Sequence, residues 1–357
     1  MRKILPDVRD DLRDVAPYVS PQRPARHPMN TNESPYPPPA GLLDEVSERL
    51  RDVALNRYPD KDAPGLFEGI ARRWGWPRDG VWIANGSNEV FLHLFLAYGG
   101  SGRSSLTFEP TYSLHSLIPR VCGTSTLHLP RAEDFRIDVD AAVESIRKQR
   151  PDFVVVCSPN NPSGGCESVD AVRALAVAAP GLVVVDEAYG EFAESEDTVR
   201  PLLEDHPNVV LVRTFSKAWR LAGVRIGYML SQPEVVAGIQ RVRLPYHLST
   251  LTQLFGEAAL HFEADTMQLV SAIKAERDRI AVELQSMGVK TFPSRANFVL
   301  FEVEDPDAIF TALMERGVLV RNYSAYEGLE RCLRVTAGLP EETGVFVAAM
   351  KEVLDAG

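Results

Sequence analysis

The sequence lacks the long apolar stretches and the paired cysteines that mark membrane and disulfide-rich proteins. No stretch approaches the ~20 apolar residues of a membrane-spanning helix. The start of the chain, MRKILPDVRDDLRDV, has no apolar core of the kind found in signal peptides. The four cysteines form no CxxC pair, which favours a reducing compartment; they are Cys122, Cys157, Cys166 and Cys332. We therefore expect a cytoplasmic protein without a membrane partner.

Positive charge is also in short supply. The chain has 38 Lys and Arg residues against 49 Asp and Glu residues, which gives a net charge of −11. Such a surface repels nucleic acid, so no nucleic-acid partner is expected. Three motifs are missing as well: GxGxxG after a strand, the Walker A lysine motif and HExxH. Their absence argues against a nicotinamide dehydrogenase, a P-loop enzyme and a zinc hydrolase, and we expect no metal.

What is present divides the chain into three parts. Residues 1–40 are rich in proline, in PQRPARHP and ESPYPPPA, and predict an extended arm with a short helix that contacts a second subunit. Residues 41–255 alternate between apolar runs and helical or loop stretches, which predicts a large α/β domain. Residues 256–357 contain a long charged helix, two strand-like runs and a terminal amphipathic helix. They predict a small α+β domain, against which the arm packs.

Three apolar runs in the large domain predict buried strands, namely 153–157 (FVVVC), 182–187 (LVVVDE) and 209–215 (VVLVRTF). Runs without polar alternation fit strands that are covered on both faces, as in a parallel sheet flanked by helices. A polar motif follows each run, and ligands of such sheets bind at the carboxyl ends of the strands. The sequence therefore predicts a site at that edge. A helical pattern from Leu42 to Leu55 stops before Pro59, which places Tyr58 on a loop.

Two charged residues at this edge are candidates for catalysis. Lys217 stands beside apolar Ala218 and Trp219, which favours a neutral, nucleophilic amine able to form a Schiff base. Asp186 ends an apolar strand, where a carboxylate needs a partner such as a pyridinium nitrogen. Taken alone, a surface lysine and a helix-capping aspartate are simpler interpretations. The neighbouring motifs decide against both.

A series of further motifs runs through nearly the whole chain. They are NTNESPY (30–36), RYPD (57–60), NGSNE (85–89), PTYSLHS (110–116), SPNNPSG (158–164), DEAYGEF (186–192), TFSKAWRLAGVRIGY (214–228), LPYHLS (244–249) and CLRVTAG (332–338). In this order they resemble the histidinol-phosphate aminotransferases, which are fold type I pyridoxal phosphate (PLP) enzymes. The resemblance implies an α/β fold with a mostly parallel central sheet flanked by helices, a smaller α+β domain, and PLP-dependent transamination.

The resemblance also assigns the catalytic residues. Lys217 would hold PLP as a Schiff base and shuttle a proton, and Asp186 would face the pyridine nitrogen. Asn161 and Tyr189 would bond to the phenolic oxygen of the ring. Tyr112 would stack on the ring face, which holds its plane steady.

The cofactor phosphate would lie at the start of a helix, where backbone N–H groups point outward. The residues implied as its ligands are Gly86, Ser87, Asn88, Thr214, Ser216 and Arg225. Tyr58 resembles the tyrosine that reaches the phosphate of the neighbouring subunit's cofactor, so the resemblance implies a homodimer with shared active sites.

Arg334 resembles the arginine that binds the carboxylate of glutamate. Residues that match the positions for the second substrate, histidinol phosphate, are Tyr18, Asn32, Tyr246 and Arg321. The chain departs from the family pattern at Ser34, Leu339 and Pro340. Because these departures affect the substrate, an aromatic amino-acid aminotransferase stays open as an alternative. A decarboxylase acting on a phosphorylated amino acid and a non-catalytic PLP-binding module are further alternatives.

Overall fold

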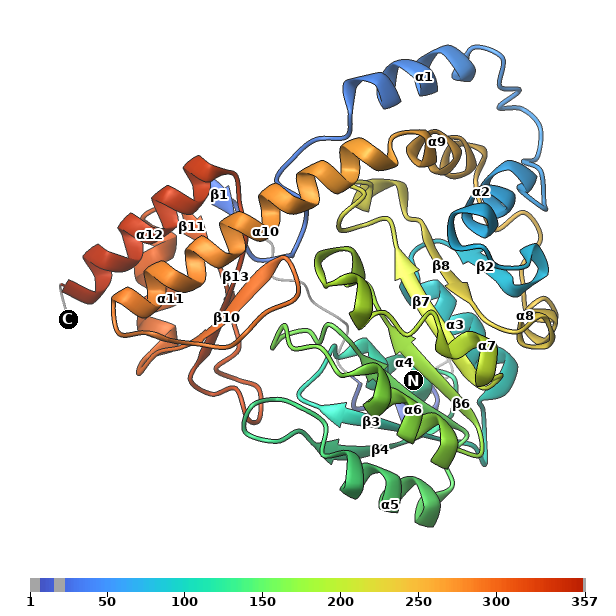
Figure 1. Ribbon diagram of the computed structural model, residues 1–357, viewed down its shortest axis with the longest axis horizontal. Coiled ribbons are helices and arrows are strands. Elements are labelled where there is room, and N and C mark those ends of the chain that lie inside the picture. Colours follow the sequence, from blue (N-terminus) through green and yellow to red (C-terminus); the bar gives the residue numbers. More distant parts are fainter. Residues whose placement is uncertain (1–6, 16–22, 356–357) are drawn as a thin grey trace, which may run out of the picture.

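A seven-stranded sheet forms the centre of the larger part of the molecule (Figure 1). The computed structural model describes residues 7–15 and 23–355. In spatial order the strands are β2 (Val81–Ala84), β8 (Gly227–Leu230), β7 (Val209–Thr214), β6 (Leu182–Asp186), β5 (Phe153–Cys157), β3 (Ser104–Glu109) and β4 (Ser125–Pro130). β8 runs antiparallel to both of its neighbours, and the other strand pairs are parallel. The expected α/β fold with a mostly parallel sheet is confirmed.

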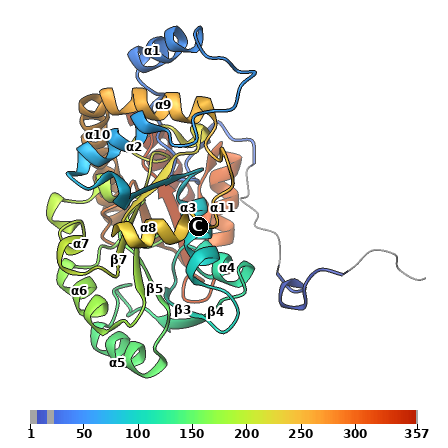
Figure 2. The ribbon, with the colours of Figure 1, turned by 90° about the vertical axis from the view of Figure 1, so that its right-hand side faces the viewer.

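Helices cover both faces of this sheet (Figures 1 and 2). One face packs against α3 (Ser87–Tyr98), α4 (Leu114–Val121) and α8 (Pro233–Ile239). The other packs against α2 (Pro64–Trp74), α5 (Val139–Gln149), α6 (Val169–Ala178) and α7 (Leu202–Asp205). Along β5, Val154 and Val156 face the second layer while Phe153 and Val155 face the first. Burial on both faces explains why the run contains no polar residue.

A second, antiparallel sheet of four strands lies in the C-terminal part. Its strands are β12 (Arg321–Asn322), β13 (Cys332–Thr336), β10 (Phe298–Glu302) and β9 (Lys290–Thr291). The helices α11 (Pro306–Glu315) and α12 (Pro340–Asp355) lie beside this sheet. In addition, β1 (His27–Pro28) and β11 (Val318–Leu319) form a short parallel pair of strands. The N-terminal segment thus packs against the C-terminal part of the chain.

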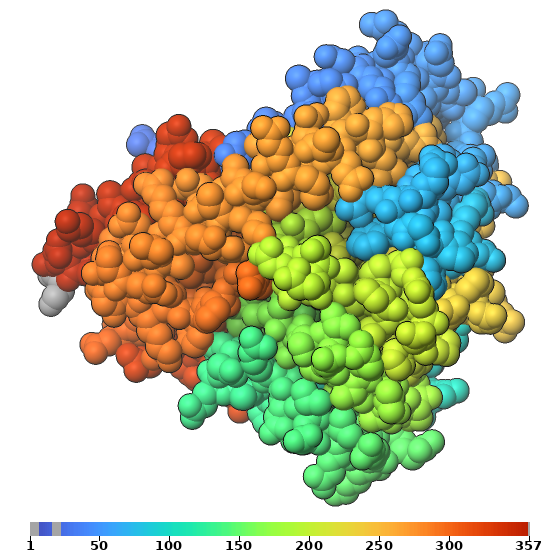
Figure 3. Space-filling model, viewed as in Figure 1, coloured from blue at the N-terminus to red at the C-terminus, as the bar shows by residue number. Residues whose placement is uncertain are grey.

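Two helices connect the two sheets. α9 (Thr250–His261) packs on α2 and on α1 (Ala40–Leu50), and α10 (Glu263–Ser286) continues along the C-terminal sheet. In the space-filling view they form one band across the molecule (Figure 3). The predicted domain boundary after residue 255 falls inside α9.

Two details of the helices can be compared with expectation. α1 ends at Leu50 rather than at Leu55, because Leu55 is 68% exposed and finds no apolar surface on which a longer helix could pack. Tyr58 lies on the loop that follows, as expected. Among the described residues, no helix combines the length and the apolar character needed to cross a membrane.

Candidate active site

The carboxyl ends of β5, β6 and β7 open into a cavity of about 230 Å³. The side of the cavity opposite the sheet is formed by residues of the C-terminal part and by residues 30–32. Thirteen of the residues predicted for the site line it: Asn32, Ser87, Asn88, Tyr112, Asn161, Asp186, Tyr189, Thr214, Ser216, Lys217, Arg225, Arg321 and Arg334. Side chains that lie far apart in the sequence therefore meet in one place.

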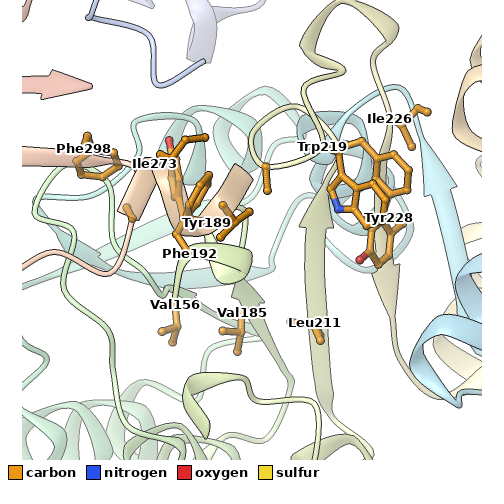
Figure 4. Packing of buried hydrophobic residues seen from close by; sticks show 14 of the residues in the cluster. Val156, Val185, Tyr189, Phe192, Leu211, Trp219, Ile226, Tyr228, Ile273 and Phe298 are labelled. Atoms are coloured by element: carbon orange, nitrogen blue, oxygen red, sulfur yellow. The ribbon is translucent and has the colours of Figure 1, made fainter. Parts of the chain in front are cut away.

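Lys217 is held by a turn whose other side chains are anchored in the core. Phe215 and Trp219 stack with ring centres 4.6 Å apart, and both are buried. The Phe215 ring also meets the ring of Tyr228 edge to face at 5.9 Å, and Trp219 and Tyr228 belong to the same buried cluster (Figure 4). The anchored turn directs the Lys217 amine into the cavity, where Nζ donates a hydrogen bond to the Thr31 carbonyl at 3.0 Å. Burial first, and then the nearby guanidinium of Arg334, lower the pKa of this amine to about 8.

Asp186 sits at the end of β6 with both of its oxygens engaged. Oδ2 lies 2.9 Å from Nε2 of His115, and Oδ1 accepts a hydrogen bond from the backbone N–H of Ala188 at 3.0 Å. The ligand atoms of His115, Cys157 and Asp186 lie within 4.8 Å of one another, a spacing that a metal ion could bridge. However, burial raises the pKa of the Cys157 thiol, and the protonated thiol is a poor ligand. The arrangement fits an oriented carboxylate better than a metal centre.

Tyr189 and Asn161 reach the cavity from the loops that follow β6 and β5. The Tyr189 hydroxyl accepts a hydrogen bond from Nδ2 of Asn32 at 2.9 Å, and burial raises the pKa of the phenol. Asn161 Oδ1 accepts a hydrogen bond from Arg334. Both polar groups are thus oriented by residues from outside the seven-stranded sheet.

The start of α3 forms a cradle suited to a phosphate group. Gly86 has a φ of +86°, and a Cβ added there would come within 2.3 Å of Nη2 of Arg225. Gly227 of β8 also packs closely against this turn. A Cβ added at Gly227 would come within 2.1 Å of the backbone nitrogen of Ser87. Arg225 donates a hydrogen bond to Ser216 Oγ at 3.3 Å. An anion requires hydrogen-bond donors. The cradle offers the N–H groups at the start of α3, the hydroxyls of Thr214 and Ser216, and the guanidinium of Arg225. The residues present therefore fit the phosphate of PLP.

Two arginines stand at the other end of the cavity. Arg321 and Arg334 are direct cross-strand partners in β12 and β13, and both guanidinium groups lie within 5.6 Å of the centre of the Tyr323 ring. Arg334 donates hydrogen bonds to the Tyr323 hydroxyl and to the Asn30 carbonyl, both at 2.7 Å. Nε of Arg334 is buried without a hydrogen-bond partner in the described part of the chain. Like charges facing each other across strands destabilise a sheet, so this pair indicates an anionic ligand.

Among the described residues, three that were predicted for the site are not among the residues that line this cavity: Gly86, Tyr58 and Tyr246. Tyr58 and Tyr246 stack on each other with ring centres 4.5 Å apart, and they are 80% and 42% exposed. Neither lines the cavity of its own chain. Tyr18 lies outside the described residues.

Several residues of the site escaped the sequence analysis. Thr31 contributes only its backbone carbonyl, which has no sequence signal. His115 lies in the first turn of α4, and its only sequence signal is a position three residues after Tyr112, which precedes the helix. Tyr323 and Tyr326 lie beside the two arginines, and Tyr326 accepts a hydrogen bond from Arg321 at 2.9 Å. These contacts depend on packing between distant segments.

Comparison with known proteins defines the class. Residues 27–349 match the aminotransferase class I and II family, and the chain belongs to this family. It is a PLP-dependent aminotransferase with small-molecule substrates, as expected.

The resemblance to the histidinol-phosphate aminotransferases is confirmed as well. The protein of that name from Thermobifida fusca is 44% identical over 349 residues, which cover 96% of this chain and 94% of the relative. The one from Mycobacterium avium is 44% identical over 356 residues and covers 97% and 88%, respectively. This chain therefore groups with these enzymes in sequence.

Solved structures show the same fold. The histidinol-phosphate aminotransferase of Sinorhizobium meliloti, in complex with pyridoxal-5'-phosphate, superposes with a TM-score of 0.87 at 27% identity and covers 94% of this chain and 92% of its own. The L-threonine-O-3-phosphate decarboxylase of Porphyromonas gingivalis superposes with a TM-score of 0.80 at 23% identity, covering 92% and 99%. The fold is therefore common to enzymes with different reactions, and the substrate must be argued from the site.

Proposed function

We propose that this aminotransferase moves an amino group between histidinol phosphate and 2-oxoglutarate, forming glutamate. The observation that carries the proposal is the pair of facing arginines, Arg321 and Arg334, which line the same cavity as the phosphate cradle but come from the C-terminal sheet. A phosphate monoester and the carboxylate of glutamate are both anions that two guanidinium groups can hold. One pair can thus serve two substrates in turn.

Tyr323 and Tyr326 add polar groups beside this pair. Their rings meet edge to face with centres 5.2 Å apart, and each hydroxyl accepts a hydrogen bond from one of the two arginines. Hydroxyl groups can act as donor or acceptor, so they suit a site that exchanges ligands of different shape. Asn32 and Tyr246, and Tyr18 from the arm, are proposed as further substrate contacts.

The chain's own residues have the following proposed roles. When bound, PLP supplies an electron sink that accepts the electron pair left on the substrate Cα. Lys217 would hold the cofactor covalently, and Nζ, once displaced by the substrate amine, would take the Cα proton, because its neutral form is accessible near neutral pH. Asp186 holds a proton at the ring nitrogen, and Asn161 and Tyr189 orient the ring through its phenolic oxygen. Tyr112 covers one ring face.

The phosphate of the cofactor is assigned to the cradle at the start of α3. The proposed ligands are Gly86, Ser87, Asn88, Thr214, Ser216 and Arg225. A fixed phosphate would keep the reactive end of the cofactor beside Lys217.

We further propose a homodimer with shared sites. Tyr58 and Tyr246 are exposed together with Leu55 and Leu244, which are 68% and 71% exposed, and a second copy would bury these apolar side chains. In that arrangement Tyr58 would contact the phosphate of the cofactor bound to the partner subunit. The arm at 1–40, the large domain at 41–255 and the small domain at 256–357 are kept as proposed units. A cytoplasmic location agrees with four free cysteines.

The test is a substrate panel with the holoenzyme. Glutamate formed from 2-oxoglutarate is measured with histidinol phosphate, histidinol and phenylalanine as amino donors, and carbon dioxide release is measured with threonine phosphate. Histidinol phosphate should exceed histidinol by about 100-fold or more in kcat/KM, since a charge-assisted bidentate contact contributes about 3 kcal/mol. A higher value for phenylalanine, or release of carbon dioxide, would overturn the assignment.

The arginine pair provides a second arm of the panel. Arg321→Met should lower kcat/KM for histidinol phosphate far more than for histidinol, because only the former carries the anion. Equal losses with both donors would contradict a role for Arg321 in phosphate binding. Arg316→Met, at an exposed arginine near the end of α11, is the control.

A further inference from the structure

Arg220 occupies a backbone conformation that disfavours every side chain. It lies three residues after Lys217 and has a φ of +61°, in the left-handed region that glycine adopts freely. Its backbone nitrogen donates to the Lys217 carbonyl at 3.2 Å, so it closes the turn that carries the catalytic amine. A residue other than glycine at such a position points to a compensating role for its side chain.

The Arg220 side chain joins two segments that lie far away in the sequence. Nη1 donates to the Pro37 carbonyl at 3.0 Å, and Nη2 lies 3.4 Å from the Thr266 hydroxyl in the first turn of α10. The residue is 9% exposed and Thr266 is 1% exposed. A buried guanidinium therefore ties the catalytic turn to the chain before α1 and to α10.

The chain before α1 covers the cavity. We call residues 30–37 the covering segment. Its Thr31 carbonyl accepts the hydrogen bond from Lys217, and its Asn32 side chain donates to the Tyr189 hydroxyl. Asn32 N also donates to the Thr336 hydroxyl at 3.0 Å. One end of the segment is thus held by the C-terminal sheet, and Arg220 holds the other end at Pro37.

We propose that Arg220 is a positioning residue of the reaction. By holding the Pro37 carbonyl, it keeps the covering segment over the cavity, so that Thr31 stays against the Lys217 amine and Asn32 against Tyr189. The inference rests on the roles proposed above for Lys217 and Tyr189, whereas its first measurement does not depend on them.

The experiment compares Arg220→Gly, Arg220→Met and wild type as holoenzymes. Arg220→Gly removes the tie and relieves the backbone, whereas Arg220→Met removes the tie and keeps both the apolar stem and the strained φ. Hydrogen exchange of the covering segment should become about tenfold faster in both variants, as expected for the loss of one hydrogen bond to a charged group. KM for both substrates should rise about tenfold, with kcat changed less, because the segment lines the binding cavity.

Arg150→Gly is the matched control. Arg150 is exposed at the end of α5 and has a φ of +49°, so the substitution relieves the same kind of strain without touching the cavity. It should leave exchange in the covering segment and KM unchanged and raise the melting temperature slightly. Unchanged exchange and KM in Arg220→Gly, with defects confined to Arg220→Met, would overturn the proposal, because backbone strain alone would then explain the residue.

Discussion

Nε2 of His115 lies 2.9 Å from Oδ2 of Asp186, with the two side chains 1% and 4% exposed. The backbone N–H of Ala188 donates a hydrogen bond to the other carboxylate oxygen, Oδ1. A buried carboxylate held at both oxygens keeps one orientation, which a directional bond to the cofactor ring requires.

Removing the Asp186 carboxylate should therefore lower kcat more than removing the His115 imidazole that orients it. Asp186→Ala should lower kcat by a factor on the order of 10² to 10³, comparable with the loss of one preorganised electrostatic group, and His115→Ala by about tenfold. Steady-state rates and cofactor affinity measure both. If His115→Ala lowered kcat as much as Asp186→Ala, His115 would do more than orient the carboxylate.

The lowered pKa of Lys217 predicts a pH profile for cofactor attachment. The amine must be neutral to react, and burial brings its pKa to about 8 from an ordinary value near 10.5. The rate at which PLP becomes attached to the apoenzyme should rise with pH and reach half of its maximum near pH 8. The visible absorbance of the bound cofactor follows the reaction.

Lys217→Ala is the companion measurement. It should retain PLP without covalent attachment and lose the visible band and almost all turnover. A midpoint near pH 10 in wild type would contradict the lowered pKa, and a persistent band with normal turnover in Lys217→Ala would contradict its role.

The phosphate cradle can be tested at Gly86. An added Cβ would come within 2.3 Å of the Arg225 guanidinium, so Gly86→Ala should displace that side chain and raise the Kd for PLP by about tenfold or more. Gly75→Ala is a control for a positive φ without a clash, since Gly75 has a φ of +55° and no atom within 4 Å of an added Cβ. Gly75→Ala should lose about 1–2 kcal/mol of stability. Gly86→Ala should lose more, because a φ of +86° with a ψ of 163° lies in a region that almost only glycine adopts. If Gly86→Ala and Gly75→Ala bound PLP with equal affinity, the contact between the added Cβ at Gly86 and the Arg225 guanidinium would not be the cause of weaker PLP binding.

A buried ion cluster lies behind the loop that carries Tyr189. Arg213 bonds to Glu187 at 2.5 Å and lies 3.3 Å from Glu191, with all three side chains at most 4% exposed. Arg213→Met should cost about 3–5 kcal/mol of unfolding free energy at neutral pH, because it leaves buried carboxylates without a cation. The exposed Arg316→Met, which removes the ion pair with Glu352, should cost at most about 1 kcal/mol.

The loss in Arg213→Met should depend on pH. Burial raises the pKa of Glu187, and without Arg213 only the hydrogen bonds from the Thr198 hydroxyl and the Val199 backbone N–H offset this effect. The folded state then binds a proton more tightly than the unfolded state, so stability falls as pH rises through the folded-state pKa. Denaturant unfolding should show a smaller loss at pH 5 than at pH 8. A loss independent of pH would contradict protonation of Glu187.

Much of the large sheet and of the cofactor site was open to prediction from the sequence. The runs at 153–157, 182–187 and 209–215 become β5, β6 and β7 almost to the residue, because strands buried on both faces consist mostly of apolar residues. Lys217 and Asp186 then follow from their places at strand ends, since parallel strands deliver those ends to one edge. These relationships are local, and the sequence alone determines them.

Only the tertiary structure decided how the cavity is closed and which groups lie against the predicted site residues. The pairing of Arg321 with Arg334, the Thr31 carbonyl beside Lys217 and the bond from Arg220 to Pro37 join segments that do not signal one another in the sequence. A backbone carbonyl has the same chemistry in every residue, and a cross-strand register depends on the packing of the whole sheet. Many of the residues that line the cavity were therefore predictable one by one, whereas the contacts that position them required the folded chain.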